Sequence, residues 1–175
     1  MWLILALYIS LNSDPMILTD FNNASELQSW YVVNDGVMGG LSKGYLRHND
    51  AGYAVFSGDI SLDNNGGFSS IRKTYNKQDI SGYTYAVLKV RGDGKKYQFR
   101  VKSSSREYHS YVYEFSTQEE WEEIIIPLKE MRPQFRGRKL NIPDYDAQSL
   151  SEIALLIGNK KEESFSLEIA AISLR

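Results

Sequence analysis

Few side chains in this sequence are of the types that nucleophilic or metal-dependent catalysis requires. The 175 residues include no cysteine and only two histidines, His48 and His109. A thiolate nucleophile, a thiolate zinc site and an iron–sulfur cluster are therefore excluded within one chain. His109 stands between Tyr108 and Ser110, and no nucleophile is fixed beside it. We interpret it as a surface residue of a strand rather than as the base of a Ser–His–Asp triad.

Carboxylates are more numerous, and one group of them could supply the acid pair that glycoside hydrolysis needs. This group consists of Glu114, Glu119, Glu120, Glu122 and Glu123. A working pair needs an enclosing cleft that separates the two pKa values, whereas a solvated acidic turn has no such requirement. We therefore favour the acidic turn.

Two further groups carry oxygen ligands of the kind that bind calcium. They are Asp59, Asp63 and Asn64, and the pair Asp144 and Asp146. Asx residues also form turns without a metal, and we favour that interpretation. We expect no catalytic residue, no metal site and no cofactor.

The charge balance does not favour a nucleic acid or an anionic membrane as partner. The chain has 20 Lys and Arg against 22 Asp and Glu, which gives a formal net charge of −2. Its basic cluster is small, and we interpret it as a solvated loop. The cluster comprises Arg132, Arg136, Arg138 and Lys139.

Residues 1–11 are almost wholly apolar, but they are too few to span a bilayer, which needs about 20. They match the length of an export leader, yet no Lys or Arg precedes them and no clear cleavage motif follows. An N-terminal strand and a misplaced start remain alternatives. We expect an apolar leader or extension over residues 1–14 and no transmembrane span. The expected location is cytoplasmic or membrane-adjacent, or periplasmic if residues 1–13 are a leader.

Residues 15–175 are expected to form a single domain, because 42% of the chain is hydrophobic and no linker or repeat divides it. The 12 Tyr, with only 4 Pro, favour strands over a helix bundle. Eight segments have strand composition: 53–57, 68–75, 83–91, 96–102, 110–116, 122–128, 150–157 and 165–174. The connection 129–149 is too long for a hairpin and predicts a crossover between two sheets. We therefore predict an all-β, jelly-roll β-sandwich.

Residues 83–102 predict an antiparallel hairpin that closes at Asp93–Gly94. In this register Val90 lies opposite Tyr97 and Leu88 lies opposite Phe99, so each apolar residue meets an apolar partner. Its outer face would carry Tyr83, Tyr85, Lys89, Arg91, Lys96, Gln98, Arg100 and Lys102. Two interpretations of this basic face remain open. It is either solvated and neutralised by Glu114, or it docks an acidic protein surface or a polyhydroxylated ligand.

Six phrases occur in a specific order along the chain. They are WYVVNDGVMGGLS (30–42), FSGDISLDNNGGFSSIR (56–72), VRGDGKKYQFR (90–100), WEEIIIPL (121–128), PQFRGR (133–138) and FSLEI (165–169). This ordered set resembles the complex I intermediate-associated protein 30 family. The resemblance implies a galactose-binding-domain-like jelly roll, akin to some carbohydrate-binding modules. It also implies a non-enzymatic, chaperone-like assembly role, and the lack of a transit peptide favours a bacterial member.

Asp35, Arg72, Asp93 and Arg136 match charged positions of these phrases, which implies either a structural ion-pair network or a ligand site. With Asn34 and the basic-face residues Lys89, Arg91 and Arg100, they are our candidate binding residues. Trp30 and Trp121 could stack on a sugar, but we favour a core position for both.

Two functions remain in view. The first is an assembly protein with a protein partner, for which respiratory complex subunits are candidates. The alternative is a carbohydrate-binding module of the periplasm or cell surface.

Overall fold

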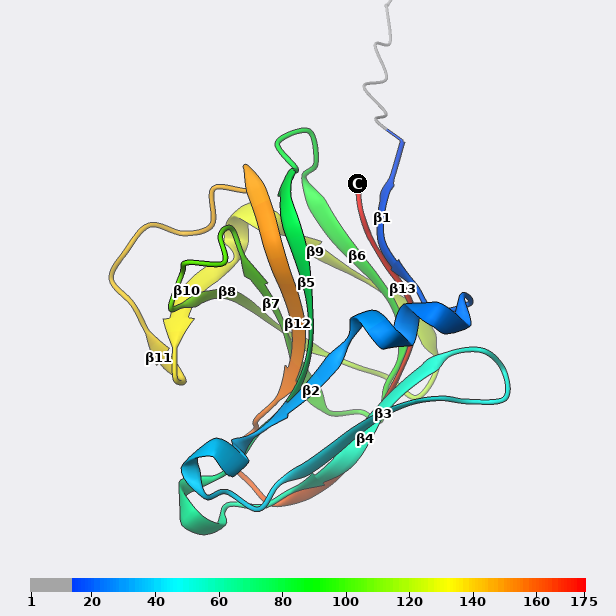
Figure 1. The fold of residues 1–175 in the computed structure, drawn as a ribbon, viewed down its shortest axis with the longest axis vertical. Helices are drawn as coiled ribbons and strands as arrows, with labels where there is room; N and C mark the ends of the chain where they lie inside the picture. The colour runs from blue at the N-terminus through cyan, green and yellow to red at the C-terminus, as the bar shows by residue number, and fades with distance from the viewer. Residues whose placement is uncertain (1–13) are drawn as a thin grey trace, which may run out of the picture.

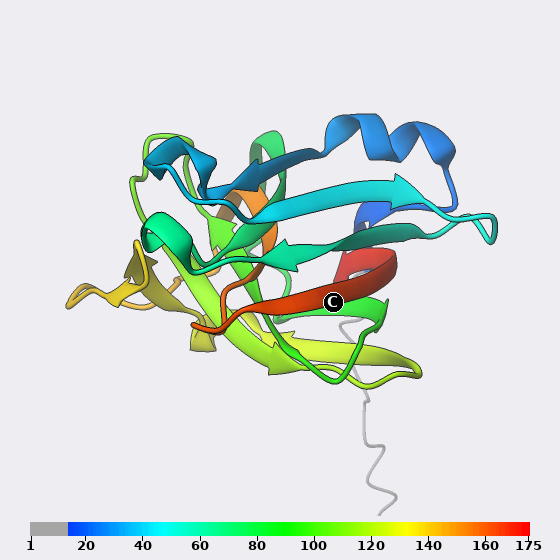
Figure 2. The ribbon, with the colours of Figure 1, turned by 90° about the horizontal axis from the view of Figure 1, so that it is seen from below.

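Two antiparallel sheets make up the computed structural model, which describes residues 14–175 (Figure 1). The six-stranded sheet has the order β3 (Lys43–His48), β4 (Ala54–Ile60), β13 (Glu163–Leu174), β6 (Tyr85–Arg91) and β9 (Trp121–Pro127), with β1 (Met16–Asp20) also paired to β13. The seven-stranded sheet has the order β11 (Arg138–Lys139), β10 (Arg132–Phe135), β8 (Ser110–Ser116), β7 (Lys96–Lys102), β12 (Ser149–Ile157), β5 (Ser69–Asp79) and β2 (Tyr31–Asn34). Figure 2 shows β3, β4 and β13 side by side.

Short 3-10 helices occupy several connections between the strands. They are η1 (Ala24–Ser29), η2 (Asp35–Met38), η3 (Asp63–Asn65) and η4 (Leu128–Glu130). Within residues 14–175, no helix has the length and apolarity needed to cross a membrane. Residues 1–13, where the leader was predicted, lie outside the described part of the chain.

The core is formed where the inward rows of the two sheets meet. Leu88 and Val90 of β6 are fully buried, and so are Phe99 of β7 and Leu155 of β12. Alternate residues along each strand point to opposite faces, so a strand that alternates apolar and polar residues buries one row and exposes the other. The predicted all-β jelly-roll sandwich is confirmed.

The predicted hairpin over residues 83–102 is wrong in its pairing, although its inward faces are correct. Strand β6 pairs with β9 and β13 in one sheet, whereas β7 pairs with β8 and β12 in the other. The chain passes from one sheet to the other after Gly92, whose amide donates to the carbonyl of Gln118. The inward rows that contain Leu88 and Phe99 therefore face each other across the core from two different sheets. The alternation of apolar and polar residues predicts which face of a strand is buried, but it does not predict which strand pairs with it.

This correction divides the predicted basic face between opposite sides of the molecule. Lys89 and Arg91 lie on the outer side of the six-stranded sheet, and Arg100 lies on the outer side of the seven-stranded sheet. Arg91 pairs with Glu168 instead of facing a lysine. Lys96 of β7 has Glu114 at 3.4 Å, the neutralising neighbour that the sequence suggested.

The long connection between β9 and β12 does cross between the sheets. It leaves the six-stranded sheet at Pro127 and enters the seven-stranded one at Arg132. The sequence did not predict that this connection contains β10 and β11, which extend the second sheet beyond β8.

Candidate binding surfaces

The buried carboxylate of Asp35 ties the η2 loop to two neighbouring segments. Asp35 is 3% exposed, and its oxygens accept the backbone N–H groups of Ser42 at 3.1 Å, Gly67 at 2.6 Å and Phe68 at 3.3 Å. Burial alone would raise the pKa of Asp35, but these hydrogen bonds outweigh it and hold the pKa below its usual value. A Cβ on Gly40 would lie 2.2 Å from the carboxylate oxygen, so this side chain is closely enclosed. The geometry of Asp35 is that of a structural anchor.

Asn34 and Asp93 have similar positions between strands. The side-chain oxygen of Asn34 accepts from the amide of Gly44 at 3.1 Å and from the hydroxyl of Ser69 at 2.6 Å. The Asp93 carboxylate accepts from the hydroxyl of Tyr97 at 3.0 Å. The side-chain oxygen of Asn34 and both carboxylate oxygens of Asp93, which also accept the amides of Lys95 and Ser166, therefore have partners within the fold.

The implied ion-pair network of Asp35, Arg72, Asp93 and Arg136 is not formed. Among residues 14–175, no ion pair joins any two of them. Arg136 follows β10 with a positive φ of 47°, and its guanidinium lies 5.3 Å from the ring centre of Phe135. These four residues therefore do not form a common ion-pair cluster.

Trp121 anchors a cluster on the outer side of the six-stranded sheet. The expectation that Trp121 lies in the core is wrong, because it pairs with the outward-facing Arg91 and is only half-buried, whereas Trp30 is buried as expected. The Arg91 guanidinium lies 5.6 Å from the Trp121 ring centre and donates to Glu168 at 2.7 Å. The ring of Tyr53 packs on Trp121 at 4.6 Å.

Large apolar side chains remain exposed around this cluster. Ile125 of β9 is 56% exposed, and its cross-strand row continues through Val87 and Ser173 to the equally exposed Ile17 of β1. Tyr85 of β6 and Tyr45 of β3 also point outward from this sheet and are exposed. We call this outer side the aromatic face, defined by Ile17, Tyr45, Tyr85, Trp121 and Ile125.

A row of arginines crosses the outer side of the seven-stranded sheet. Six residues lie opposite one another on successive strands β2, β5, β12, β7, β8 and β10. In that order they are Tyr31, Arg72, Ala154, Arg100, Val112 and Arg132. We call these six residues the arginine row. Arg132 pairs with Asp144, but within residues 14–175 neither Arg72 nor Arg100 has a carboxylate within ion-pair distance.

The two unpaired guanidiniums are poorly solvated. Burial and then the positive charge of Arg72 lower the pKa of Arg100 to about 10, although the charge of Glu152 acts in the opposite direction. One Arg100 nitrogen donates to the side-chain oxygen of Gln98 at 2.9 Å. The Nε of Arg72 is buried and has no hydrogen-bond partner among the described residues. The Tyr31 hydroxyl, at the edge of this group, donates to Glu152 at 3.5 Å.

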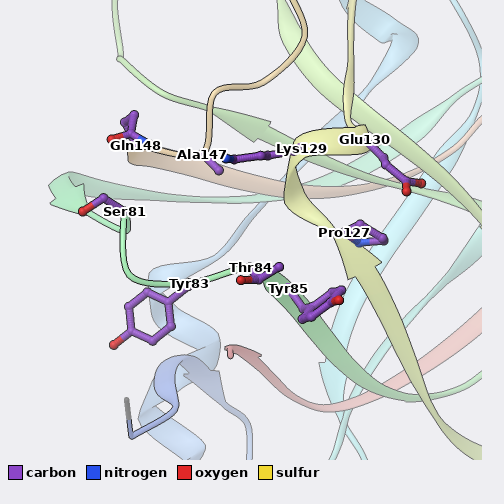
Figure 3. Close-up of a pocket in the computed structure, with 9 residues that line it drawn as sticks. All are labelled: Ser81, Tyr83, Thr84, Tyr85, Pro127, Lys129, Glu130, Ala147 and Gln148. Atoms are coloured by element: carbon purple, nitrogen blue, oxygen red, sulfur yellow. The ribbon is translucent and has the colours of Figure 1, made fainter. Parts of the chain in front are cut away.

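One pocket of about 320 Å³ opens at an end of the sandwich, where β6 begins and β9 ends (Figure 3). Its charged side chains are Lys129 and Glu130 from η4, and Figure 3 shows Lys129 extending toward Ala147. Tyr83 and Tyr85 complete the wall beside β6. The pocket lining contains no histidine and one carboxylate, that of Glu130.

His109 is not the surface residue that the sequence suggested. It is 8% exposed, with the rings of Tyr108 at 5.2 Å and Tyr111 at 5.0 Å. Neither of its ring nitrogens has a hydrogen-bond partner in the described chain. No nucleophile is held against it, and the geometry of a catalytic triad is not present among residues 14–175.

The acidic candidates are also dispersed. Glu114 is on β8 of one sheet, whereas Glu123 is on β9 of the other, where it pairs with Arg175. Asp59 accepts the hydroxyl of Ser164, and Asp144 pairs with Arg132. No group of three or more metal-ligating side chains occurs within the described residues.

The sequence analysis missed Tyr31 and Glu152 as neighbours of Arg72 and Arg100. Their proximity depends on β12 lying between β5 and β7, an order that no local pattern encodes. The available signal was that Arg72 and Arg100 each end a family phrase, as Arg138 ends a third.

Solved structures with a similar fold include carbohydrate-binding modules. The family 11 carbohydrate-binding module of the cellulosomal cellulase Lic26A-Cel5E of Clostridium thermocellum has a TM-score of 0.66 and 16% identity, covering 92% of this chain and 94% of the module. Agarase AgWH50C has a TM-score of 0.59 and 13% identity, covering 93% of this chain and 24% of the agarase. At these identities the likeness shows the fold alone.

Sequence comparison provides the family. A probable mitochondrial complex I intermediate-associated protein 30 of Caenorhabditis briggsae is 26% identical over 182 aligned positions, covering 88% of this chain. The chain spans about half of that relative, 52% of its length. The family model of complex I intermediate-associated protein 30 matches residues 19–169, which include nearly every strand described above. The chain therefore belongs to the complex I intermediate-associated protein 30 family.

Proposed function

We propose that this chain is a non-enzymatic assembly protein that binds a protein partner through the aromatic face. The observation that carries the proposal is the group of exposed aromatic and aliphatic side chains around Trp121 on the six-stranded sheet. Contiguous exposed apolar patches mark interaction sites, and we propose that one partner covers these side chains together.

The composition of the aromatic face suits a protein interface. Binding hot spots are enriched in Trp, Tyr and Arg, and here Trp121, Arg91 and Tyr45 share one side of a sheet. Packing by Tyr53 and the Arg91–Glu168 pair hold the Trp121 ring in place. A side chain that is fixed before association loses less conformational entropy on binding.

Family membership supports the class of partner. The name of the worm relative associates it with intermediates of complex I, so subunits or assembly intermediates of a respiratory complex are the partners we propose. The role is that of a chaperone which binds and releases subunits without chemistry.

A pull-down from solubilised respiratory membranes tests this proposal, with the bound subunits quantified by mass spectrometry. Ile125→Glu places a charge on the aromatic face at an edge strand and should reduce capture of complex I subunits about tenfold. Val37→Glu is the matched control, since Val37 is 93% exposed in η2 and lies off this face. Both variants should melt close to the unaltered protein. Unchanged capture by Ile125→Glu, or equal loss in both variants, would contradict the proposal.

Carbohydrate binding is the second candidate, and the likeness to carbohydrate-binding modules across 92% of the chain favours it. The polar outer side of the seven-stranded sheet is the surface available for it, on the opposite side from the aromatic face. Retention on a glycan array, without capture of respiratory subunits, would favour this candidate over the first.

A further inference from the structure

We propose that the arginine row binds an acidic saccharide, with a sugar carboxylate held between Arg72 and Arg100. The inference rests on the second candidate function and is independent of protein docking at the aromatic face. It specifies both the charge of the ligand and the residues that select it.

The unsatisfied charge is the first argument. Three other arginines have a carboxylate partner, namely Arg91 with Glu168, Arg132 with Asp144 and Arg175 with Glu123. Arg72 and Arg100 have none within the described residues, although they lie close enough for the charge of one to lower the pKa of the other. Partly buried charges normally have a partner, because their lost hydration must be replaced. A carboxylate from a ligand would supply that partner.

The spacing of the row is the second argument. Arg72 and Arg100 flank Ala154, so their backbones are two strand spacings apart, about 10 Å. Ala154 carries only a methyl group, so no long side chain of β12 stands at the register position directly between the two arginines. Two guanidiniums can therefore converge on one carboxylate, and planar guanidinium groups bind carboxylates with paired hydrogen bonds.

The groups around the arginines favour a saccharide over an acidic peptide. Gln98, Thr74 and Tyr31 carry amide or hydroxyl groups, and Ser70 beside Arg72 has a buried hydroxyl without a partner in the described chain. These groups match the many hydroxyls of a sugar ring. The carboxylate of Glu152, which accepts the Tyr31 hydroxyl, can also accept sugar hydroxyls.

Binding of uronate polymers to the full chain tests the proposal, with polygalacturonate, alginate and hyaluronate as probes in affinity electrophoresis or calorimetry. The methyl ester of polygalacturonate has the same sugar backbone without its charge, and polyglutamate supplies carboxylates without sugar. We expect at least one uronate polymer to bind about tenfold more tightly than both controls, and more weakly as salt increases. This comparison uses the unaltered protein, so its outcome does not depend on how any variant folds.

A charge-matched pair of variants then locates the site. Arg72→Gln with Arg100→Gln should lower the affinity for the uronate polymer about tenfold or more. Lys77→Gln with Lys160→Gln removes the same charge from exposed positions outside the row and should leave the affinity unchanged.

Three results would overturn the proposal: equal binding of the acid and its methyl ester, equal binding of polyglutamate, or no binding of any uronate polymer. Retained affinity in the arginine variant would also overturn it. None of these results bears on the capture of respiratory subunits, so the two proposals fail separately.

Discussion

Replacing Asp35 by Asn should destabilise the fold even though the two side chains have nearly the same shape. The Asp35 carboxylate accepts three backbone N–H groups, and Asp35 and Ser42 are both almost fully buried. An Asn amide has one oxygen and one NH₂ group. If the Asn NH₂ group takes the place of Oδ1, it faces the Ser42 amide, and if it takes the place of Oδ2, it faces the amides of Gly67 and Phe68. In both cases at least one backbone N–H loses its acceptor.

An unsatisfied buried donor costs about 1–3 kcal/mol. We therefore expect Asp35→Asn to lower the free energy of unfolding by about 2 kcal/mol. In a chain of this length each kcal/mol corresponds to about 2–4 °C, so the melting temperature should fall by about 4–8 °C. Thermal unfolding followed by circular dichroism measures this loss. Asp63→Asn is the matched control, because Asp63 is an exposed carboxylate in the adjacent η3 segment.

The pH dependence gives a second, independent readout. The pKa of Asp35 is lower in the folded protein than its usual value near 3.8. Its contribution to stability is therefore fully present above that usual value and is lost as the pH falls through the lowered, folded-state pKa. The difference in melting temperature between the unaltered protein and Asp35→Asn should therefore become smaller as the pH falls through this acidic range. A variant that melts within about one degree of the unaltered protein at neutral pH would refute the reasoning, and so would a difference that does not change with pH.

Two further substitutions test the packing that positions the binding surfaces. Lys73→Met removes the cation that donates to Glu26 and to the carbonyl of Leu18, and it should cost about 1–3 kcal/mol in urea unfolding, whereas Lys77→Met at an exposed site of the same strand should cost little. Burial raises the pKa of Glu26, but the hydrogen bonds from Lys73 and Thr19 lower it further, so the folded-state pKa lies below the usual 4.5. The loss of unfolding free energy in Lys73→Met should therefore become smaller as the pH falls below 4.5. Gly92→Ala would bring a Cβ to within 2.1 Å of Thr117 and should lower the melting temperature by several degrees, whereas Gly82→Ala meets no atom within 4 Å and should be neutral or slightly stabilising.

Local patterns in the sequence were enough to assign most of the strands and the inward rows of two of them. Alternation in residues 85–91 and 96–102 placed Leu88, Val90 and Phe99 inward, and all three are fully buried. The long connection after Pro127 correctly indicated a passage between sheets. These features are local, because they follow from the two-residue period of a strand and from the length of chain needed to join two strands.

Which strands are neighbours depends on the tertiary fold, and the make-up of the candidate sites depends on those neighbours. The two-residue period of a strand determines which face each side chain occupies, but it does not determine which strand lies alongside. The patterns of β6 and β7 were therefore compatible with a hairpin, although the two strands belong to different sheets. Arg72 and Arg100 became members of one row because β12 lies between their strands. Asp35 is an anchor because the segment at Gly67 and Phe68, more than 30 residues away, brings two amides to its carboxylate beside that of Ser42. Such sites depend on contacts between residues far apart in the chain, and therefore no local pattern could reveal them.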